Sequence, residues 1–225
     1  NLEKLVTVEV DIPDGVKIRF NNLILDKPFK GNYFSGLPIH LEVLPSFDYD
    51  FVGWKSLKSD SRFISFHPGE DIKIVPLVEK RKQSTYAHKV IITEIDAEQD
   101  STYDTDFIEL YNTTEQTMDL SGWIISDINN TYQIPENTLL KAKEYLVITE
   151  NDQIFHKAYE GAALGGLSFG INKKGEVLCL YDIDSCLVDI VDTRQWSKEQ
   201  KGLNWSRSSH SANNVNYHSW IQELP

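Results

Sequence analysis

The sequence predicts an all-β chain that folds as two domains. Every second residue across 6–12 is apolar, and this alternation favours a strand in the first domain. In the second domain, residues 90–95 and 107–111 are short β-branched or aromatic runs bounded by polar turn residues, which again favours strands. A helical pattern is expected in one region only, residues 152–159, where Asn151 or Asp152 could cap a short helix.

The first domain is predicted to span residues 1–79. Pro13-Asp14-Gly15 predicts a turn after the first strand, and apolar residues then alternate again across 16–20. Asn21-Asn22 predicts a second turn. Further strands are expected at residues 39–43, 49–54 and 72–74. The polar, aperiodic residues 80–89 are predicted to form a linker.

The second domain is predicted to span residues 90–200. Within 107–111, Ile108 and Leu110 share one face of the expected strand, because successive side chains of a strand alternate between faces. Gly122 permits a tight bend, and Trp123 then offers a large side chain for a core between two sheets.

Three motifs in this second domain resemble the lamin tail domain family. They are Glu94-Ile95, the strand sequence Phe-Ile-Glu-Leu-Tyr-Asn at 107–112, and Asp-Leu-Ser-Gly-Trp at 119–123. The resemblance implies an immunoglobulin-like β-sandwich of the lamin tail type, preceded here by a small β-domain. It also implies a binding or structural module, and it does not name the partner.

Other segments resemble parts of bacterial surface proteins. Residues 31–45 and 49–54 resemble β-repeat modules, internalin-type B repeats among them. Residues 202–207 resemble the segment that follows lamin tail modules in bacterial proteins, so 201–225 are expected to form a C-terminal extension packing on the sandwich. Together these features resemble the C-terminal region of spore-coat-H-like proteins and imply an extracellular or cell-surface location at a bacterial envelope.

The charge balance is acidic, with 34 Asp and Glu against 22 Lys and Arg and a net charge of −12 among 225 residues. Binding to nucleic acid depends largely on basic side chains that neutralise phosphates, so no nucleic-acid partner is expected. A cytoskeletal or nucleic-acid-binding tail is therefore a disfavoured alternative. No apolar run approaches the roughly 18–20 residues that span a bilayer, so no membrane-spanning segment is expected.

Acidic residues are dense around the first two strands of the second domain. The candidate metal ligands among them are Glu94, Asp96, Asp104, Asp106 and Glu109. Calcium takes six to eight oxygen ligands, which a loop between paired strands could supply. The segment has no glycine for a sharp turn, so a solvated acidic loop stays open as the alternative. If calcium binds, millimolar calcium should raise the melting temperature; no other cofactor is expected.

The chain is not expected to be an enzyme. Gly166-Leu167-Ser168-Phe169-Gly170 fits the pattern G-x-S-x-G, but a turn into a strand follows it where a nucleophile elbow needs a helix. A hydrolase using Ser168 or a carboxylate pair is the alternative function. The scattered histidines and two cysteines do not form a zinc-site pattern.

Cys179 and Cys186 flank a predicted turn at 182–185. A tight turn there would place Cys186 opposite Tyr181, so free thiols are favoured over a disulfide and the redox compartment stays open. The expected function is adhesion or assembly at a bacterial cell envelope by a non-enzymatic module, through protein or glycan contacts.

Overall fold

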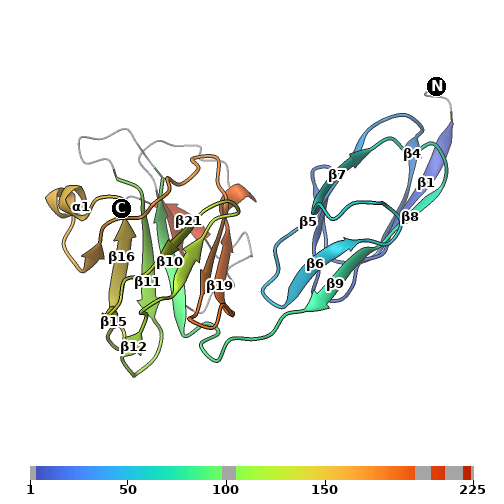
Figure 1. The fold of residues 1–225 in the computed structure, drawn as a ribbon. Coiled ribbons are helices and arrows are strands. Elements are labelled where there is room, and N and C mark those ends of the chain that lie inside the picture. Colours follow the sequence, from blue (N-terminus) through green and yellow to red (C-terminus); the bar gives the residue numbers. More distant parts are fainter. Residues whose placement is uncertain (1–3, 98–104, 196–203, 211–219, 224–225) are drawn as a thin grey trace. The chain divides into compact units, whose positions relative to one another are not determined.

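The computed structural model describes residues 4–97, 105–195, 204–210 and 220–223 (Figure 1). The chain divides into two compact units, residues 1–81 and 82–225. Strands account for nearly all regular structure in both units, so the predicted all-β class is confirmed. No helix within the described ranges has the length and apolar character needed to cross a membrane.

In the first unit, the described residues form nine strands arranged in three small sheets. The strands are β1 (Leu5–Val10), β2 (Ile18–Phe20), β3 (Leu23–Leu25), β4 (Phe29–Phe34), β5 (Ile39–Val43), β6 (Tyr49–Trp54), β7 (Phe63–Phe66), β8 (Ile72–Ile74) and β9 (Pro76–Lys80). The sheets have the orders β4-β1-β8, β3-β2-β5-β7 and β6-β9.

The predicted alternation of the first unit is confirmed by burial. Val6, Val8 and Val10 of β1 point into its core, and Ile18 and Phe20 of β2 do the same. The strands predicted at 39–43, 49–54 and 72–74 are present as β5, β6 and β8. Prediction missed β3, β4, β7 and β9.

The described residues of the second unit form two main sheets and one short helix. Its elements are β10 (Val90–Asp96), β11 (Phe107–Asn112), β12 (Met118–Asp119), β13 (Ile124–Ser126), β14 (Thr131–Gln133), β15 (Leu139–Leu140), β16 (Tyr145–Thr149), α1 (Asp152–Ala158), β17 (Ala163–Leu164), β18 (Val177–Tyr181), β19 (Leu187–Asp192), a 3-10 turn (Thr193–Gln195), β20 (Asn204–Arg207) and β21 (Trp220–Glu223). One sheet has the order β17-β16-β11-β10-β20-β21, the other β14-β13-β18-β19, and β12 pairs with β15.

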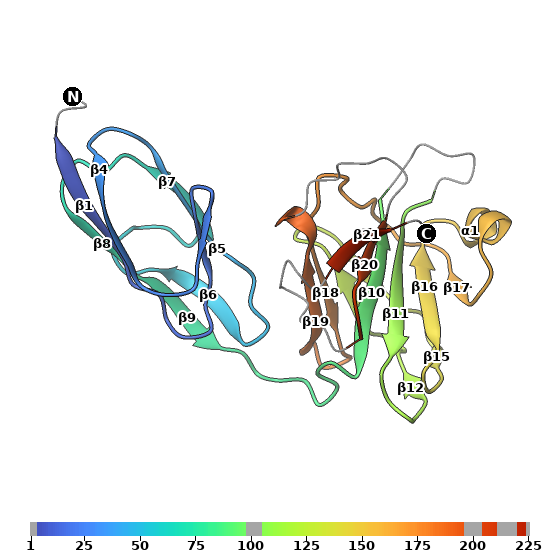
Figure 2. The same cartoon turned by 180° about the vertical axis from the view of Figure 1, so that it is seen from behind.

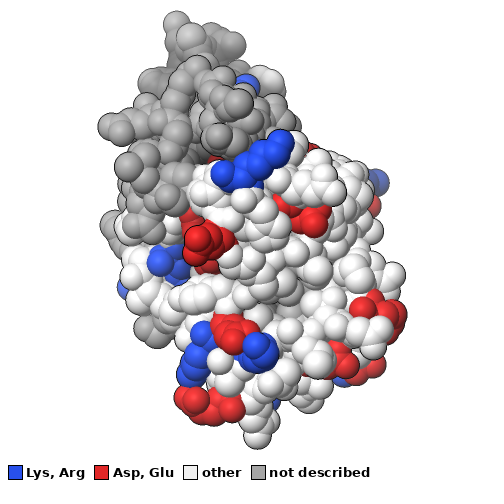
Figure 3. Space-filling model, turned by 90° about the vertical axis from the view of Figure 1, so that its left-hand side faces the viewer, with Lys and Arg blue, Asp and Glu red and all other residues white. Residues whose placement is uncertain are grey.

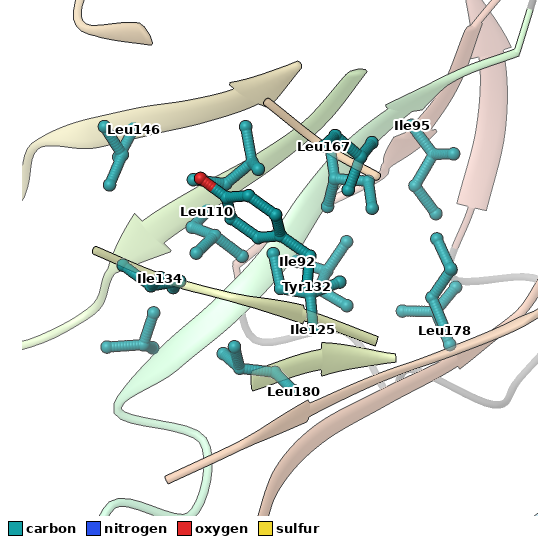
Figure 4. Packing of buried hydrophobic residues seen from close by; sticks show 14 of the residues in the cluster. Ile92, Ile95, Leu110, Ile125, Tyr132, Ile134, Leu146, Leu167, Leu178 and Leu180 are labelled. Atoms are coloured by element: carbon teal, nitrogen blue, oxygen red, sulfur yellow. The ribbon is translucent and has the colours of Figure 1, made fainter. Parts of the chain in front are cut away.

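The two main sheets enclose a single apolar core, part of which Figure 4 shows. Ile108 and Leu110 point into this core, as the strand pattern predicted, and Trp123 is buried after the bend at Gly122. Gly122 has a positive φ of 73°. A Cβ there would lie 2.5 Å from Ile183 Cδ1, so a larger residue would be both strained and crowded.

The C-terminal strands complete the six-stranded sheet. β20 pairs with β10, placing Trp205 opposite Ile95, and β21 extends the sheet beyond β20. The indole rings of Trp205 and Trp220 are buried in the same core as the strands of the sandwich. The tail therefore supplies part of the core of the second unit.

A buried ion pair fastens this tail to the opposite sheet. Arg207 Nη2 donates to Asp189 Oδ2 at 2.9 Å, and Ile92 N donates to the same oxygen at 2.8 Å. Arg207 Nε donates to Ile92 O at 2.9 Å, so one side chain joins β20, β10 and β19. Burial lowers the pKa of Arg207, and Asp189 offsets part of that effect.

The connection between the units has more structure than the predicted linker at 80–89. Lys80 ends β9, and Arg81 remains bonded to the first unit through its amide, which donates to Asp48 O at 2.8 Å. Ser84 is buried in the second unit, where its hydroxyl donates to Asp182 Oδ2 at 2.5 Å. The passage from one unit to the other is therefore confined to a few residues.

Two local predictions are resolved by the structure. Asn151 is the N-cap of α1, because its side chain accepts a hydrogen bond from Ile154 N at 3.1 Å. Both cysteines are free thiols. Cys186 does not face Tyr181, however, because a register shift places Leu187 opposite Tyr181.

Candidate functional site

The predicted acidic residues Glu94 and Glu109 lie on β10 and β11, which are neighbouring strands of the six-stranded sheet (Figure 2). Ile95 and Ile108, which face each other on β10 and β11, point into the core. The neighbouring residues Glu94 and Glu109 therefore point outward, because side chains alternate along each strand.

A β-bulge at Thr93 sets the pairing of these two carboxylates. Ile92 faces Leu110, the register shifts, and Glu94 then faces Glu109. An extra residue in one strand changes which side chains stand opposite each other. This register places Glu94 and Glu109, two of the candidate metal ligands, opposite each other, and we call these two residues the acidic pair.

Each carboxylate of the acidic pair has a hydrogen-bond donor of its own. Thr93 Oγ1 donates to Glu109 Oε1 at 2.7 Å, and Asn204 Nδ2 donates to Glu94 Oε1 at 2.6 Å. Burial raises the pKa of Glu109, and the bond from Thr93 offsets part of that rise. Like charges directly opposite each other destabilise a strand pair.

The acidic pair lies in a row that crosses five strands. From β16 to β21, the row is Val147, Glu109, Glu94, Ser206 and Ile221. Ser206 is buried, and its hydroxyl has no hydrogen-bond partner within the described part of the structure. The row thus places two carboxylates and a hydroxyl between two apolar side chains.

An aromatic cluster borders the acidic pair on one side. The rings of Tyr111 and Tyr145 have centroids 4.6 Å apart, and His210 stacks on Tyr111 at 3.9 Å. Tyr145 Oη and His210 Nε2 are hydrogen-bonded at 3.1 Å. Tyr145 is 43% exposed, so the cluster is open to solvent. Burial raises the pKa of Tyr145, with a smaller contribution from the negative charge of Glu109.

A second aromatic cluster borders the acidic pair at the end where α1 lies. Phe107 makes edge contacts with Phe155 of α1 and with Tyr159, at centroid distances of 5.6 and 5.9 Å. Burial raises the pKa of Tyr159, and the charges of Asp96 and Glu94 add to that rise. The charges of the acidic pair therefore act on tyrosines of both clusters.

The structure separates the predicted metal ligands. Glu94, Asp96 and Glu109 belong to the outer face of the sheet, whereas Asp106 accepts a hydrogen bond from Ile171 N in the loop before β18. Asp104 lies outside the described residues. Among the residues that are described, no three His, Cys, Asp or Glu side chains are grouped as a metal site. Calcium binding stays a prediction.

Ser168 lies in a loop, and no helix follows it before β18. Its hydroxyl donates to Thr131 O at 3.1 Å. That bond joins the loop to β14 and does not prepare the hydroxyl as a nucleophile, which would require an adjacent base.

Glu176 has a strongly shifted carboxyl group. Burial raises its pKa to about 7, a backbone bond from Asn172 lowers it, and the charges of Asp127 and Asp106 raise it further. Asn172 N donates to Glu176 Oε1 at 3.1 Å, so the carboxyl closes the turn that leads into β18. Its role in the described structure is to hold this turn.

Three functional or structural residues were missed by sequence reasoning. Asn112 donates its side-chain amide to Gln116 O, Leu140 O and Lys141 O, tying the end of β11 to β15. Neither His210, which stacks on Tyr111, nor Asp189, which binds Arg207, was singled out from the sequence. A charged residue inside an apolar strand, such as Asp189 in Leu-Val-Asp-Ile-Val, was the available signal for a buried pair.

Comparison with known proteins gives one family match. The family model described as Lamin Tail Domain matches residues 83–197, just over half of the 225-residue chain. No curated protein matches the chain.

One similar solved structure is the crystal structure of a DUF4876 family protein from Bacteroides thetaiotaomicron VPI-5482. It is 10% identical in sequence, and the alignment covers 97% of this chain and 92% of that protein, with a TM-score of 0.36. A score at this level supports no conclusion about fold or function.

Proposed function

The chain belongs to the lamin tail domain family through residues 83–197, and from that premise we propose that it is a non-enzymatic module for adhesion or assembly. The partner that its geometry favours is a protein presenting a Lys or Arg side chain to the acidic pair. The main observation that supports this proposal is that Glu94 and Glu109 are paired directly across two strands on the outer face of the sheet.

Physical chemistry favours a cationic group at this place. Opposed carboxylates repel each other, and the partial burial of Glu109 limits the help that water gives. A Lys or Arg between them relieves this repulsion through charge-assisted hydrogen bonds. The exposed ring of Tyr145 nearby adds a surface suited to cation–π contact, which operates within about 6 Å of a ring centroid.

The charge of the whole chain supports the same class of partner. A net charge of −12 attracts basic proteins over distances limited by salt, and it repels nucleic acid. On the face of the molecule in Figure 3, basic side chains occur in small groups beside acidic ones, without an extended basic patch among the described residues drawn there. These observations favour a basic protein over nucleic acid.

The test uses peptides that contain Lys and Arg, together with the same peptides carrying Gln at the basic positions. In fluorescence anisotropy, we expect the full chain to bind the basic peptides and to show no binding to the Gln peptides. Glu109→Gln should weaken binding by about tenfold, which corresponds to about 1.4 kcal/mol. Glu136→Gln removes an exposed carboxylate from the turn before β15 and serves as the matched control.

Salt, pH and chelation separate this proposal from its alternatives. Binding should weaken with salt and as the pH falls through the raised pKa of Glu109, because protonation removes the charge. Equal binding of the Gln peptides, or salt-independent binding of neutral glycans in their place, would contradict the proposal. Binding abolished by EDTA would instead support calcium at the predicted acidic loop.

We place this module at a bacterial cell surface or in a secreted protein. Support comes from the resemblance of residues 31–45, 49–54 and 202–207 to segments of bacterial surface proteins. Protease added to intact producing cells should then degrade the protein while a cytoplasmic marker survives. Full protection of the protein under conditions that digest a known surface protein would exclude this location.

A further inference from the structure

The four-stranded sheet of the first unit has one core face and one solvent face. Ile18 and Phe20 of β2 and Leu41 of β5 point into the core. Their neighbours Arg19 and Glu42 therefore belong to the opposite face, since side chains alternate along a strand.

Four side chains form one row across that opposite face. Arg19 of β2 is paired with Ile24 of β3 on one side and with Glu42 of β5 on the other, and Glu42 is paired with Phe63 of β7. Strands are about 4.8 Å apart, so the row Ile24, Arg19, Glu42, Phe63 extends over about 14 Å. We call these four residues the cross-strand row.

The apolar ends of the cross-strand row are open to solvent. Ile24 is 48% exposed and Phe63 is 55% exposed. Between them, Arg19 Nη1 donates to Glu42 Oε2 at 2.7 Å, forming a partly buried ion pair. His40 stacks on Phe63 at a centroid distance of 6.2 Å and supports the ring on the sheet.

The order of side chains in the row is self-complementary. A two-fold axis parallel to the strands, passing between β2 and β5, exchanges the basic position with the acidic one and one apolar end with the other. In a face-to-face pair of copies, Arg19 then lies against Glu42 of the second copy, and Ile24 against Phe63 of the second copy. Two-fold contacts require this reciprocity, in which one patch meets itself.

We propose that the cross-strand row is a self-association surface through which two copies of this chain meet face to face. Each Arg19 then lies between its own Glu42 and the Glu42 of the second copy, so four charges of alternating sign share one network. Such networks of ion pairs contribute more than isolated surface pairs. The apolar ends are removed from water at both edges of the network. A partner of a single charge sign would repel one half of this row.

The test exploits the charge order of the row in the full chain. Arg19→Glu makes both central positions acidic, and Glu42→Arg makes both basic. We expect wild type to dimerise with rising concentration, up to about 1 mM, because small contacts are weak. Each variant alone should stay monomeric, and an equimolar mixture should restore a one-to-one dimer in sedimentation equilibrium.

A second pair of variants examines the apolar ends. Phe63→Ser should weaken dimerisation by about tenfold, whereas Phe34→Ser, which changes a ring 49% exposed on β4, should leave it unchanged. Circular dichroism checks that every variant is folded. A wild-type chain that stays monomeric at about 1 mM overturns the proposal. So does a mixture of the two charge variants that fails to associate, or a dimer that persists in both.

Discussion

At the residue scale, burial acts strongly on Glu176, whose pKa is raised from 4.5 to about 7. Between these two values the folded chain holds the proton more tightly than the unfolded chain does. Stability therefore falls as the pH rises through this window, and the loss is complete above the folded pKa. The turn at 172–176 is therefore held by the Glu176 carboxyl, whose neutral form stabilises the folded chain more than its charged form does.

Replacing Glu176 with Gln tests whether the charged carboxylate lowers the stability of the folded chain. Glu176→Gln keeps an oxygen to accept the bond from Asn172 N and removes the charge. We expect the variant to be more stable than wild type by roughly 1 kcal/mol at pH 8, after allowance for solvent screening, and nearly equal at pH 4. Urea unfolding at both pH values measures the difference. A difference that is the same at both pH values would show that the charge is not responsible.

The buried pair of Arg207 and Asp189 makes a second prediction. Asp189→Ala leaves the Arg207 guanidinium buried and removes the acceptor of Ile92 N, so we expect a loss of about 3–5 kcal/mol. Lys141→Met breaks an exposed pair with Glu144 and should cost less than about 1 kcal/mol. Midpoints of urea unfolding compare the two variants. A similarly small loss of unfolding free energy in both variants would mean that the buried pair contributes no more to stability than the exposed one.

The residues of the candidate site were only partly predictable. Glu94 and Glu109 could be placed together because their strands were adjacent, but the bulge at Thr93 that sets the pairing leaves no mark in the sequence. The stacking of His210 on Tyr111 brings together residues far apart in sequence, and no local pattern indicates this contact. Contacts between distant segments depend on register, and register is a property of the assembled sheet.

At the element scale, strands with a clear alternation or apolar run were predictable, and strands without one, such as β4, were not. β1, β10 and β11 carry clear alternation or apolar runs, which burial of one face demands. β12, β15 and β17 have two residues each, too few for any period to be visible. β9 begins at Pro76, a residue that usually argues against a strand and is accepted at its first position.

The C-terminal strands supply a prediction at this scale. The family match ends at residue 197, yet β20 covers the edge of β10 and buries Trp205 in the core. A chain ending at residue 197 should therefore bind a hydrophobic dye and lose cooperative thermal unfolding of the second unit. Ile221→Ser, at an exposed position of β21, should change stability by less than about 0.5 kcal/mol. An unchanged melting temperature in the shortened chain would show that the family core folds without these strands.

At the scale of the whole molecule, composition predicted a folded acidic protein, and strand patterns predicted the all-β class. Neither could predict which side chains lie next to one another on the faces of the sheets. The acidic pair and the cross-strand row each depend on residues far apart in sequence that register brings side by side, such as Arg19 with Glu42. Both proposed binding surfaces therefore depend on residues paired across strands, an arrangement that a linear sequence does not display.

The division into two units makes the final prediction. Arg81 is bonded to the first unit, because Nη2 donates to Asp50 Oδ1 at 2.5 Å, and Ser84 is bonded to the second through Asp182. Protease cleavage requires local extension of the backbone, which these anchors resist on either side. We therefore expect limited trypsin digestion to cut after Lys82 and to release a stable first unit that ends there, detected by mass spectrometry. Lys82→Gln should slow this cleavage, whereas Lys58→Gln, within the first unit, should not. Persistent resistance of the wild-type chain at Lys82 would mean that the connection is protected by contacts beyond its two anchors.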